Sequence, residues 1–149
     1  MDERHEAELL DAIEIWTRAI RRDPRDVTAR KARGAAFAEL GNFERASRDF
    51  AKALRLDPSP LIRYYRGLDY LRMGEPGMAI AEFTNALVLD PGFLEAVEHR
   101  ADAFRVLHDE ARAALDDRQA RRIRRRQART RLVVETAQQD AREVPLKTA

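Results

Sequence analysis

A repeating spacing of small and aromatic residues runs through the first two thirds of the chain. An alanine, an aromatic residue and a second alanine follow at steps of four and three, and a proline comes five residues later. Residues at these steps lie on one face of an α-helix. The copies are 34 and then 33 residues apart: Ala12-x3-Trp16-x2-Ala19-x4-Pro24, Ala46-x3-Phe50-x2-Ala53-x4-Pro58 and Ala79-x3-Phe83-x2-Ala86-x4-Pro91. The pattern predicts a recurring helix whose aromatic residues, Trp16, Phe50 and Phe83, are largely buried.

A second element precedes two of these copies at a fixed distance. It reads Gly34-x2-Phe37-x3-Gly41 and Gly67-x2-Tyr70-x3-Gly74. The first glycine of each removes a side chain where two helices cross. The second stands where a helix must stop, because glycine accepts the left-handed conformation beyond a C-terminus. Each proline of the first pattern ends one helix or opens the next. The repeating unit is therefore a helix, a short turn and a second helix.

The pattern also predicts how the units follow one another. Residues 3–22 supply a second helix alone, full pairs lie near 27–56 and 61–89, and a third pair begins at about 94–107 and continues after His108. From Asp109 to Val144 there is neither glycine nor proline, so one long helix, or two with a soft join, is expected. We predict an all-α solenoid of about three helix pairs with a long C-terminal helix. Its expected parts are a repeat domain at 3–115, an arginine-rich capping or extension helix at 116–144 and a disordered tail at 145–149.

The composition of the chain excludes several kinds of site and of function. The chain of 149 residues has no cysteine, which excludes disulfides, cysteine nucleophiles and thiolate metal sites. No stretch approaches the roughly 20 apolar residues of a membrane span, and the first residues do not resemble a signal peptide, so a cytoplasmic location is expected. Residues 1–110 carry 17 basic and 21 acidic side chains, whereas residues 111–149 carry 11 and 5. The basic character is therefore concentrated in the last quarter.

The repeat resembles the tetratricopeptide repeat, which reads W-x2-L-G-x2-Y…A-x3-F…P over about 34 residues. The match covers roughly residues 8–107 and is best in the second helix of each unit. The first helices depart from it: the tryptophan position holds Arg30, Arg63 and Val97, and the leucine position holds Arg33, Arg66 and Arg100. The last unit also has Ala101 for the first glycine and His108 for the turn glycine. The resemblance implies a protein-interaction module or scaffold rather than an enzyme.

By this resemblance, the first helices line a concave groove that binds an extended peptide or a helix. The groove positions are Thr28, Lys31, Ala35 and Ala38, then Leu61, Tyr64, Leu68 and Leu71, then Glu95, Glu98, Asp102 and Arg105. Steps of three and four place each set on one helix face. The middle set is apolar and the last is acidic, so we expect a partner with apolar anchors followed by basic residues. The alternative is that the middle set packs against a terminal helix of the same chain.

Some family members hold the C-terminal carboxylate of heat-shock chaperones with a clamp of lysines, asparagines and an arginine. Only Lys31 matches that clamp. The other clamp positions hold Ala35, Tyr65, Glu95 and His99, which remove donors or reverse the charge. The sequence therefore argues against an adaptor for chaperone tails.

A stripe of arginines on the C-terminal helix is the second candidate surface. At about 100° per residue, six side chains fall within an arc of about 140°: Arg118, Arg121, Arg122, Arg125, Arg126 and Arg129. Like charges at this spacing oppose helix formation and favour an anionic partner. Three readings remain open: a solvated cap face, an acidic protein partner, or nucleic acid bound through its phosphates. The stripe could also dock on the acidic groove residues, within one molecule or between two copies.

Catalytic motifs are absent from the sequence. It contains no glycine-rich phosphate loop, no HExxH and no GxSxG. Glu95, His99 and Asp102 have a spacing that metals can use, but acidic helix faces with a single histidine are common. We therefore expect no enzyme activity, no cofactor and no metal. A protein is the expected partner, self-association is a second option, and nucleic acid is the alternative from a different class.

Overall fold

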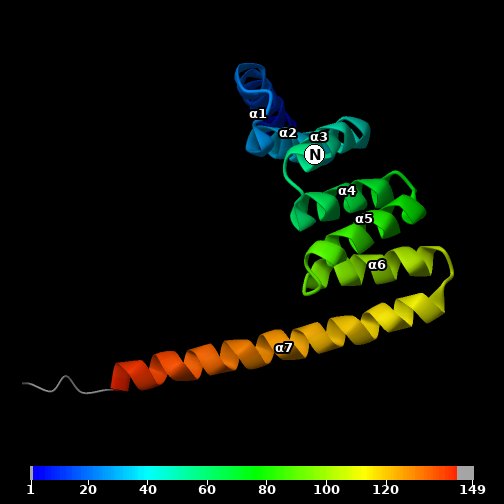
Figure 1. The fold of residues 1–149 in the computed structure, drawn as a ribbon. Coiled ribbons are helices and arrows are strands. Elements are labelled where there is room, and N and C mark those ends of the chain that lie inside the picture. Colours follow the sequence, from blue (N-terminus) through cyan, green and yellow to red (C-terminus); the bar gives the residue numbers. More distant parts are fainter. Residues whose placement is uncertain (1, 144–149) are drawn as a thin grey trace, which may run out of the picture.

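The computed structural model describes the backbone of residues 2–143 and the side chains of residues 2–139 and 141. Within that range the chain forms seven α-helices: α1 (Glu3–Arg22), α2 (Val27–Glu39), α3 (Phe43–Leu56), α4 (Pro60–Arg72), α5 (Pro76–Leu89), α6 (Leu94–Val106) and α7 (Glu110–Glu143). The tail predicted at 145–149 lies outside the described residues. Consecutive helices pack against each other and stack in chain order from α1 to α7 (Figure 1). The predicted α-solenoid is confirmed.

Side-chain caps mark the start of α2, α3 and α4, where short polar side chains accept hydrogen bonds from free backbone N–H groups. Asp26, Asn42 and Ser59 each accept a hydrogen bond from an N–H in the first turn of α2, α3 and α4 respectively. Such caps stabilise a helix by about 1 kcal/mol each. The turns inside the first two pairs contain Gly41 and Gly74 at φ of 75° and 76°. The third turn has the same left-handed conformation at His108, with φ of 58° and no glycine.

In the first two pairs, the second helix buries its aromatic residue against the glycine of the first helix. Phe50 and Phe83 are 1% and 0% exposed. A Cβ on Gly34 would lie 2.9 Å from the Phe50 ring, and one on Gly67 would lie 2.5 Å from the Phe83 ring. Both distances are shorter than real Cβ contacts, so the glycines are required by packing. The predicted burial is confirmed for both phenylalanines.

Trp16 is the exception, because it is only half-buried. The predicted burial is therefore less complete at Trp16 than at the two phenylalanines. Within the described residues α1 packs on α2 alone, whereas α3 and α5 each lie between two neighbours. One side of the Trp16 ring is therefore left uncovered. The same position leaves Leu10 and Ile15 of α1 exposed.

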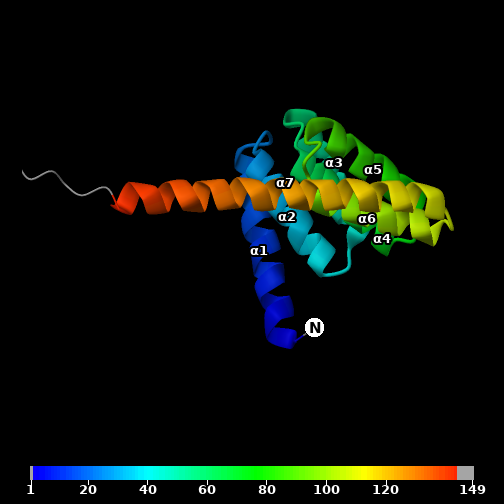
Figure 2. The same cartoon turned by 90° about the horizontal axis from the view of Figure 1, so that it is seen from below.

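The third pair shows why α7 is long. Its first part repeats the buried alanines at Ala113 and Ala120, with Asp117 in the place of the aromatic residue. Ala101 precedes Asp117 by the same 16 residues that separate Gly34 from Phe50, so alanine takes the place of the glycine where no aromatic ring follows. The proline that should follow is replaced by Arg125. Nothing then stops the helix, and α7 continues as one helix well past the stack (Figure 2).

None of the helices described, from residue 3 to residue 143, is both long and apolar enough to cross a membrane.

Candidate partner-binding groove

Buried ion pairs join the two helices of every pair. Arg33 donates two hydrogen bonds of 2.7 Å to Asp49, and Arg100 donates two, of 2.9 and 2.7 Å, to Asp116. Arg66 donates to Glu82 at 3.2 Å in the middle pair. Each arginine also donates to a hydroxyl of the preceding unit: Thr17, Ser47 or Thr84. The two-bond pairs of Arg33 and Arg100 fix both distance and orientation.

These arginines are the ones that depart from the leucine of the family pattern. The pattern of a single helix does not reveal the partners of these arginines, because each partner lies on the following helix. The signal was present as a constant offset of 16 residues between Arg33 and Asp49, Arg66 and Glu82, and Arg100 and Asp116. The hydrogen bond with Asp49 raises the pKa of Arg33 above its ordinary value, so Arg33 stays charged. The ladder of ion pairs therefore holds the first helices, which carry the predicted groove positions, at fixed spacing.

The predicted groove residues lie on α2, α4 and α6, which touch one another along the stack. Tyr64 is packed inside this chain rather than free. Its ring lies 4.9 Å from the Phe93 ring and 5.9 Å from the Phe83 ring, and its hydroxyl is 3.4 Å from His99 Nδ1. Burial raises the pKa of the Tyr64 hydroxyl. Its aromatic neighbours come from α5, α6 and the loop between them, and the core cluster on which it packs also contains Ala120 of α7.

The other apolar groove residues remain accessible. Leu61 is 38% exposed, while Leu68 and Leu71 are half-buried. Leu68 lines a hollow of about 360 Å³ between α2 and α4, together with Ala35, Ala38, Glu39, Phe50, Tyr65, Asp69 and Arg72. Lys31 is half-buried on α2 and is not among the residues that line this hollow. Glu39, Asp69 and Arg72 were not predicted as site residues, because their positions fall outside the family's groove set.

The acidic end of the predicted groove is partly neutralised. Glu98 pairs with Arg124 of α7, an arginine outside the six-residue stripe. Asp102 pairs with Arg105 at 2.8 Å, and Arg105 also reaches Asp117 of α7 at 2.6 Å. The hydrogen bond with Asp117 raises the pKa of Arg105. Glu95 is exposed. The acidic field at this end is therefore weaker than the sequence alone suggests.

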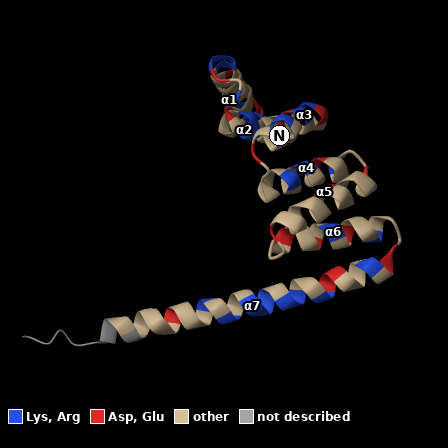
Figure 3. Ribbon diagram, in the orientation of Figure 1, with Lys and Arg blue, Asp and Glu red and all other residues tan. Residues whose placement is uncertain are grey.

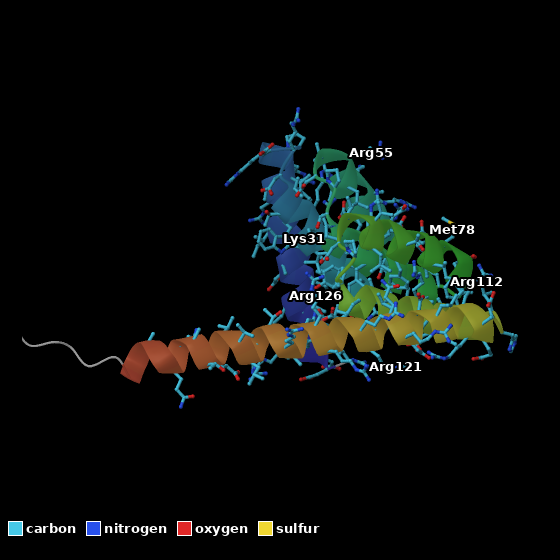
Figure 4. The ribbon with its side chains drawn as sticks, turned by 60° about the horizontal axis from the view of Figure 1, so that its bottom comes forward. Lys31, Arg55, Met78, Arg112, Arg121 and Arg126 are labelled. Atoms are coloured by element: carbon cyan, nitrogen blue, oxygen red, sulfur yellow. The ribbon has the colours of Figure 1, made fainter. Side chains whose placement is uncertain are left out.

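The arginine stripe lies along the middle of α7, where basic residues dominate (Figure 3). All six side chains are exposed, and none forms an ion pair with another residue whose side chain is described. Arg121 and Arg126 extend from different sides of the helix, as expected for the two edges of the arc (Figure 4). Arg121 lines a small hollow of about 240 Å³ that also includes Glu98 and Asp102. Arg126 lines a larger one of about 520 Å³, with Pro91, Gly92, Ile123, Gln127, Thr130 and Arg131.

His99, the histidine between Glu95 and Asp102 on α6, contacts other groups of the same chain. His99 Nδ1 lies 2.9 Å from the carbonyl oxygen of Glu95, one turn earlier in α6. Its ring contacts Tyr64 at 5.5 Å between centroids. Over the residues described, no three histidine or acidic side chains are arranged to hold a metal ion.

Comparison with known proteins places this architecture in a family. The model of the tetratricopeptide repeat matches residues 7–60 and 64–128. The chain belongs to the tetratricopeptide repeat family. The second match runs past residue 107 into α7, in agreement with the buried positions Ala113 and Ala120. The first part of α7 is thus the second helix of a third tetratricopeptide unit.

Two curated relatives share part of the chain. A tetratricopeptide repeat and J domain-containing co-chaperone of Cryptococcus neoformans var. grubii is 37% identical over 62 residues, 41% of this chain and 12% of the relative. Hsp70-Hsp90 organizing protein 2 of Arabidopsis thaliana is 33% identical over 89 residues, 59% of this chain and 16% of the relative. The chain therefore spans only a small part of the length of these relatives.

Solved structures share the fold. A crystal structure of MamA protein has a TM-score of 0.77 and 23% identity, and the match covers 81% of this chain and 67% of that one. The second tetratricopeptide domain of Spaghetti (RPAP3), bound to the HSP90 peptide SRMEEVD, has a TM-score of 0.63 and 24% identity. That match covers 67% of this chain and 94% of the other. At these identities the likeness concerns the fold alone.

Proposed function

We propose that this chain is a protein-interaction module that binds a segment of a partner protein in the groove formed by α2, α4 and α6. The observation that carries the proposal is the accessible apolar row of Leu61, Leu68 and Leu71 beside the 360 Å³ hollow. Accessible leucines next to a hollow supply buried area on binding, which is the main source of affinity at interfaces. The ion-pair ladder supports the proposal, because a preformed groove loses little entropy when a segment binds.

The chemistry of the groove favours a partner segment with apolar anchors and basic residues. Glu39, Asp69 and Glu95 are acidic side chains on the first helices. The peptide bound by the Spaghetti domain, SRMEEVD, is rich in acidic residues. An acidic peptide would meet like charges here. We therefore propose a partner of a different class from that peptide, for which the charges set direction and rate of association.

A variant in the groove tests the proposed function. A peptide selected from a random library on the full chain should bind Leu68→Ala roughly tenfold more weakly, the effect of losing one central apolar contact. The measurement is titration calorimetry or fluorescence anisotropy. Val88→Ala is the matched control, since Val88 is 75% exposed on α5, outside the groove helices, and its removal should leave affinity unchanged.

Ionic strength separates groove binding from the arginine stripe. Apolar contacts change little with salt, whereas binding of phosphates to the stripe would weaken steeply between low and moderate ionic strength. The selected peptide should therefore keep its affinity within about twofold over that range. Equal affinities of wild type and Leu68→Ala, together with a steep loss in salt, would move the binding surface to α7.

A further inference from the structure

Asp69 stands where the other two units have a buried alanine. It lies on α4, two residues after Gly67, and the corresponding positions are Ala36 on α2 and Ala103 on α6. All three side chains are buried, and Asp69 is 1% exposed. Because alanine serves this position twice in the same fold, packing between the helices does not require a carboxylate there.

The Asp69 carboxylate is poorly satisfied. Its Oδ1 lies 3.7 Å from the Arg72 guanidinium, beyond hydrogen-bond distance. Its Oδ2 is buried and has no hydrogen-bond partner among the residues described. Asp49 and Asp116 differ, because each accepts two hydrogen bonds from an arginine. A buried acceptor left without a partner destabilises the fold.

Burial raises the pKa of Asp69 to about 7 from the ordinary value of 3.8, and the charge of Arg72 only partly opposes this. The other charged side chain that lines the hollow is Glu39 of α2. Glu39 is paired in turn with His5 of α1, at 2.7 Å. From α3 the hollow receives the apolar Phe50 ring. The hollow thus contains two carboxyl groups and one arginine, and that arginine also lies over the Phe43 ring at 5.7 Å.

We propose that Asp69 determines the specificity of the groove by binding one lysine or arginine side chain of the partner segment, seated in the hollow between α2 and α4. This assignment rests on the proposed function of the groove. The apolar stem of the basic side chain packs against Ala35, Ala38 and Leu68, and its charged end pairs with the carboxylate. The unpartnered Oδ2 gains a donor in the complex. The destabilising residue in the free protein is therefore the selective contact in the bound one.

Binding of the basic side chain is coupled to a proton. At neutral pH part of the free protein carries Asp69 as the neutral acid, and the bound cation favours the carboxylate. The O–H bond of the acid breaks, its electron pair stays on the carboxylate oxygen, and the proton goes to solvent. Affinity for a basic peptide should therefore rise as pH increases towards about 8. Asp69→Asn is the control variant, because its side chain cannot release this proton. Any change of peptide affinity with pH that remains in Asp69→Asn comes from His5, Glu39 or the peptide.

The experiment compares peptides selected from one random library on the full wild-type chain and on full-length Asp69→Ala. Wild-type binders should contain a lysine or arginine at a fixed distance from their apolar anchors, and should bind Asp69→Ala at least tenfold more weakly. Replacing that basic residue by norleucine should weaken binding to wild type by a similar factor and leave binding to Asp69→Ala unchanged. Equal losses on both proteins, or binders without a fixed basic residue, would overturn the assignment but leave the groove function intact. A library that yields no wild-type binder would overturn both.

Thermal unfolding provides an independent readout. Asp69→Ala should raise the melting temperature by about 3–6 °C at about pH 8, and the gain should vanish near pH 4. The folded wild-type protein keeps a proton on Asp69 that the unfolded chain releases. The stability of the wild type therefore falls as the pH rises from about 4 to about 8, and Asp69→Ala avoids this loss. Asp49→Ala is the matched control and should lower the melting temperature, since Arg33 loses its partner. A lower melting temperature for Asp69→Ala would make Asp69 a structural residue and contradict the assignment.

Discussion

Phe50→Ala should lower the free energy of unfolding by about 3–5 kcal/mol, the range for large aromatic residues removed from a core. Phe50 is fully enclosed between α2, α3 and α4, and its ring lies directly against the backbone of Gly34. A shorter side chain would leave a cavity that the glycine cannot fill. Urea unfolding followed by circular dichroism at 222 nm gives the value.

The matched control is Phe37→Ala. Phe37 is a half-buried phenylalanine on α2, so its removal exposes less apolar surface and opens no enclosed cavity. Phe37→Ala should therefore lower the free energy of unfolding by less than half as much as Phe50→Ala does. A Phe50→Ala change below about 1 kcal/mol would be incompatible with the repeat core described above.

Asp116→Ala should destabilise the third pair by about 2–4 kcal/mol, because Arg100 then keeps a largely buried charge without its partner. The side chains of Arg100 and Asp116 are 17% and 5% exposed. Their two hydrogen bonds connect α6 to the first part of α7, so hydrogen exchange in both helices should rise together. Equilibrium unfolding of the full chain measures the loss of stability.

A double variant separates the ion pair from general packing. Arg100→Leu restores the leucine of the tetratricopeptide pattern, and in combination with Asp116→Ala it leaves no unpaired charge. The double variant should therefore be more stable than Asp116→Ala alone, which is a non-additive result. Asp102→Ala removes an exposed pair and should change stability by less than about 0.5 kcal/mol. If the stability losses of Arg100→Leu and Asp116→Ala simply add in the double variant, the ion pair makes no contribution beyond general packing.

The helix pairs could be predicted because their spacing is determined by a few residue types. Phe50 and Gly34 recur as Phe83 and Gly67 at the same offset, and the packing of one on the other fixes the crossing of each pair. The long α7 could be predicted from the missing glycine and proline. The continuation of the third pair past His108 could be predicted too, but the repeat was expected to end at residue 115, because Asp117 replaces the aromatic residue that marks the other copies.

The electrostatics of the site could not be predicted in the same way. A helix-face pattern considers one helix at a time, whereas the partner of Arg33 is on another helix, 16 residues later. The pattern also could not show that Arg124, rather than a member of the stripe, meets Glu98. The pattern of α4 does not distinguish Asp69 from an exposed polar residue, because the hollow beside it is lined by residues of α2 and α3 as well as α4.

The absence of cysteine from the chain allows a direct test of where the partner binds. Single variants Leu61→Cys, Val88→Cys and Arg122→Cys would carry a photocrosslinker in the groove, on α5 outside it, and on the arginine stripe. With a peptide selected on the wild-type chain, irradiation should crosslink the peptide to position 61 and leave positions 88 and 122 unmodified. Crosslinking at 88 or 122 without any at 61 would contradict binding in the groove.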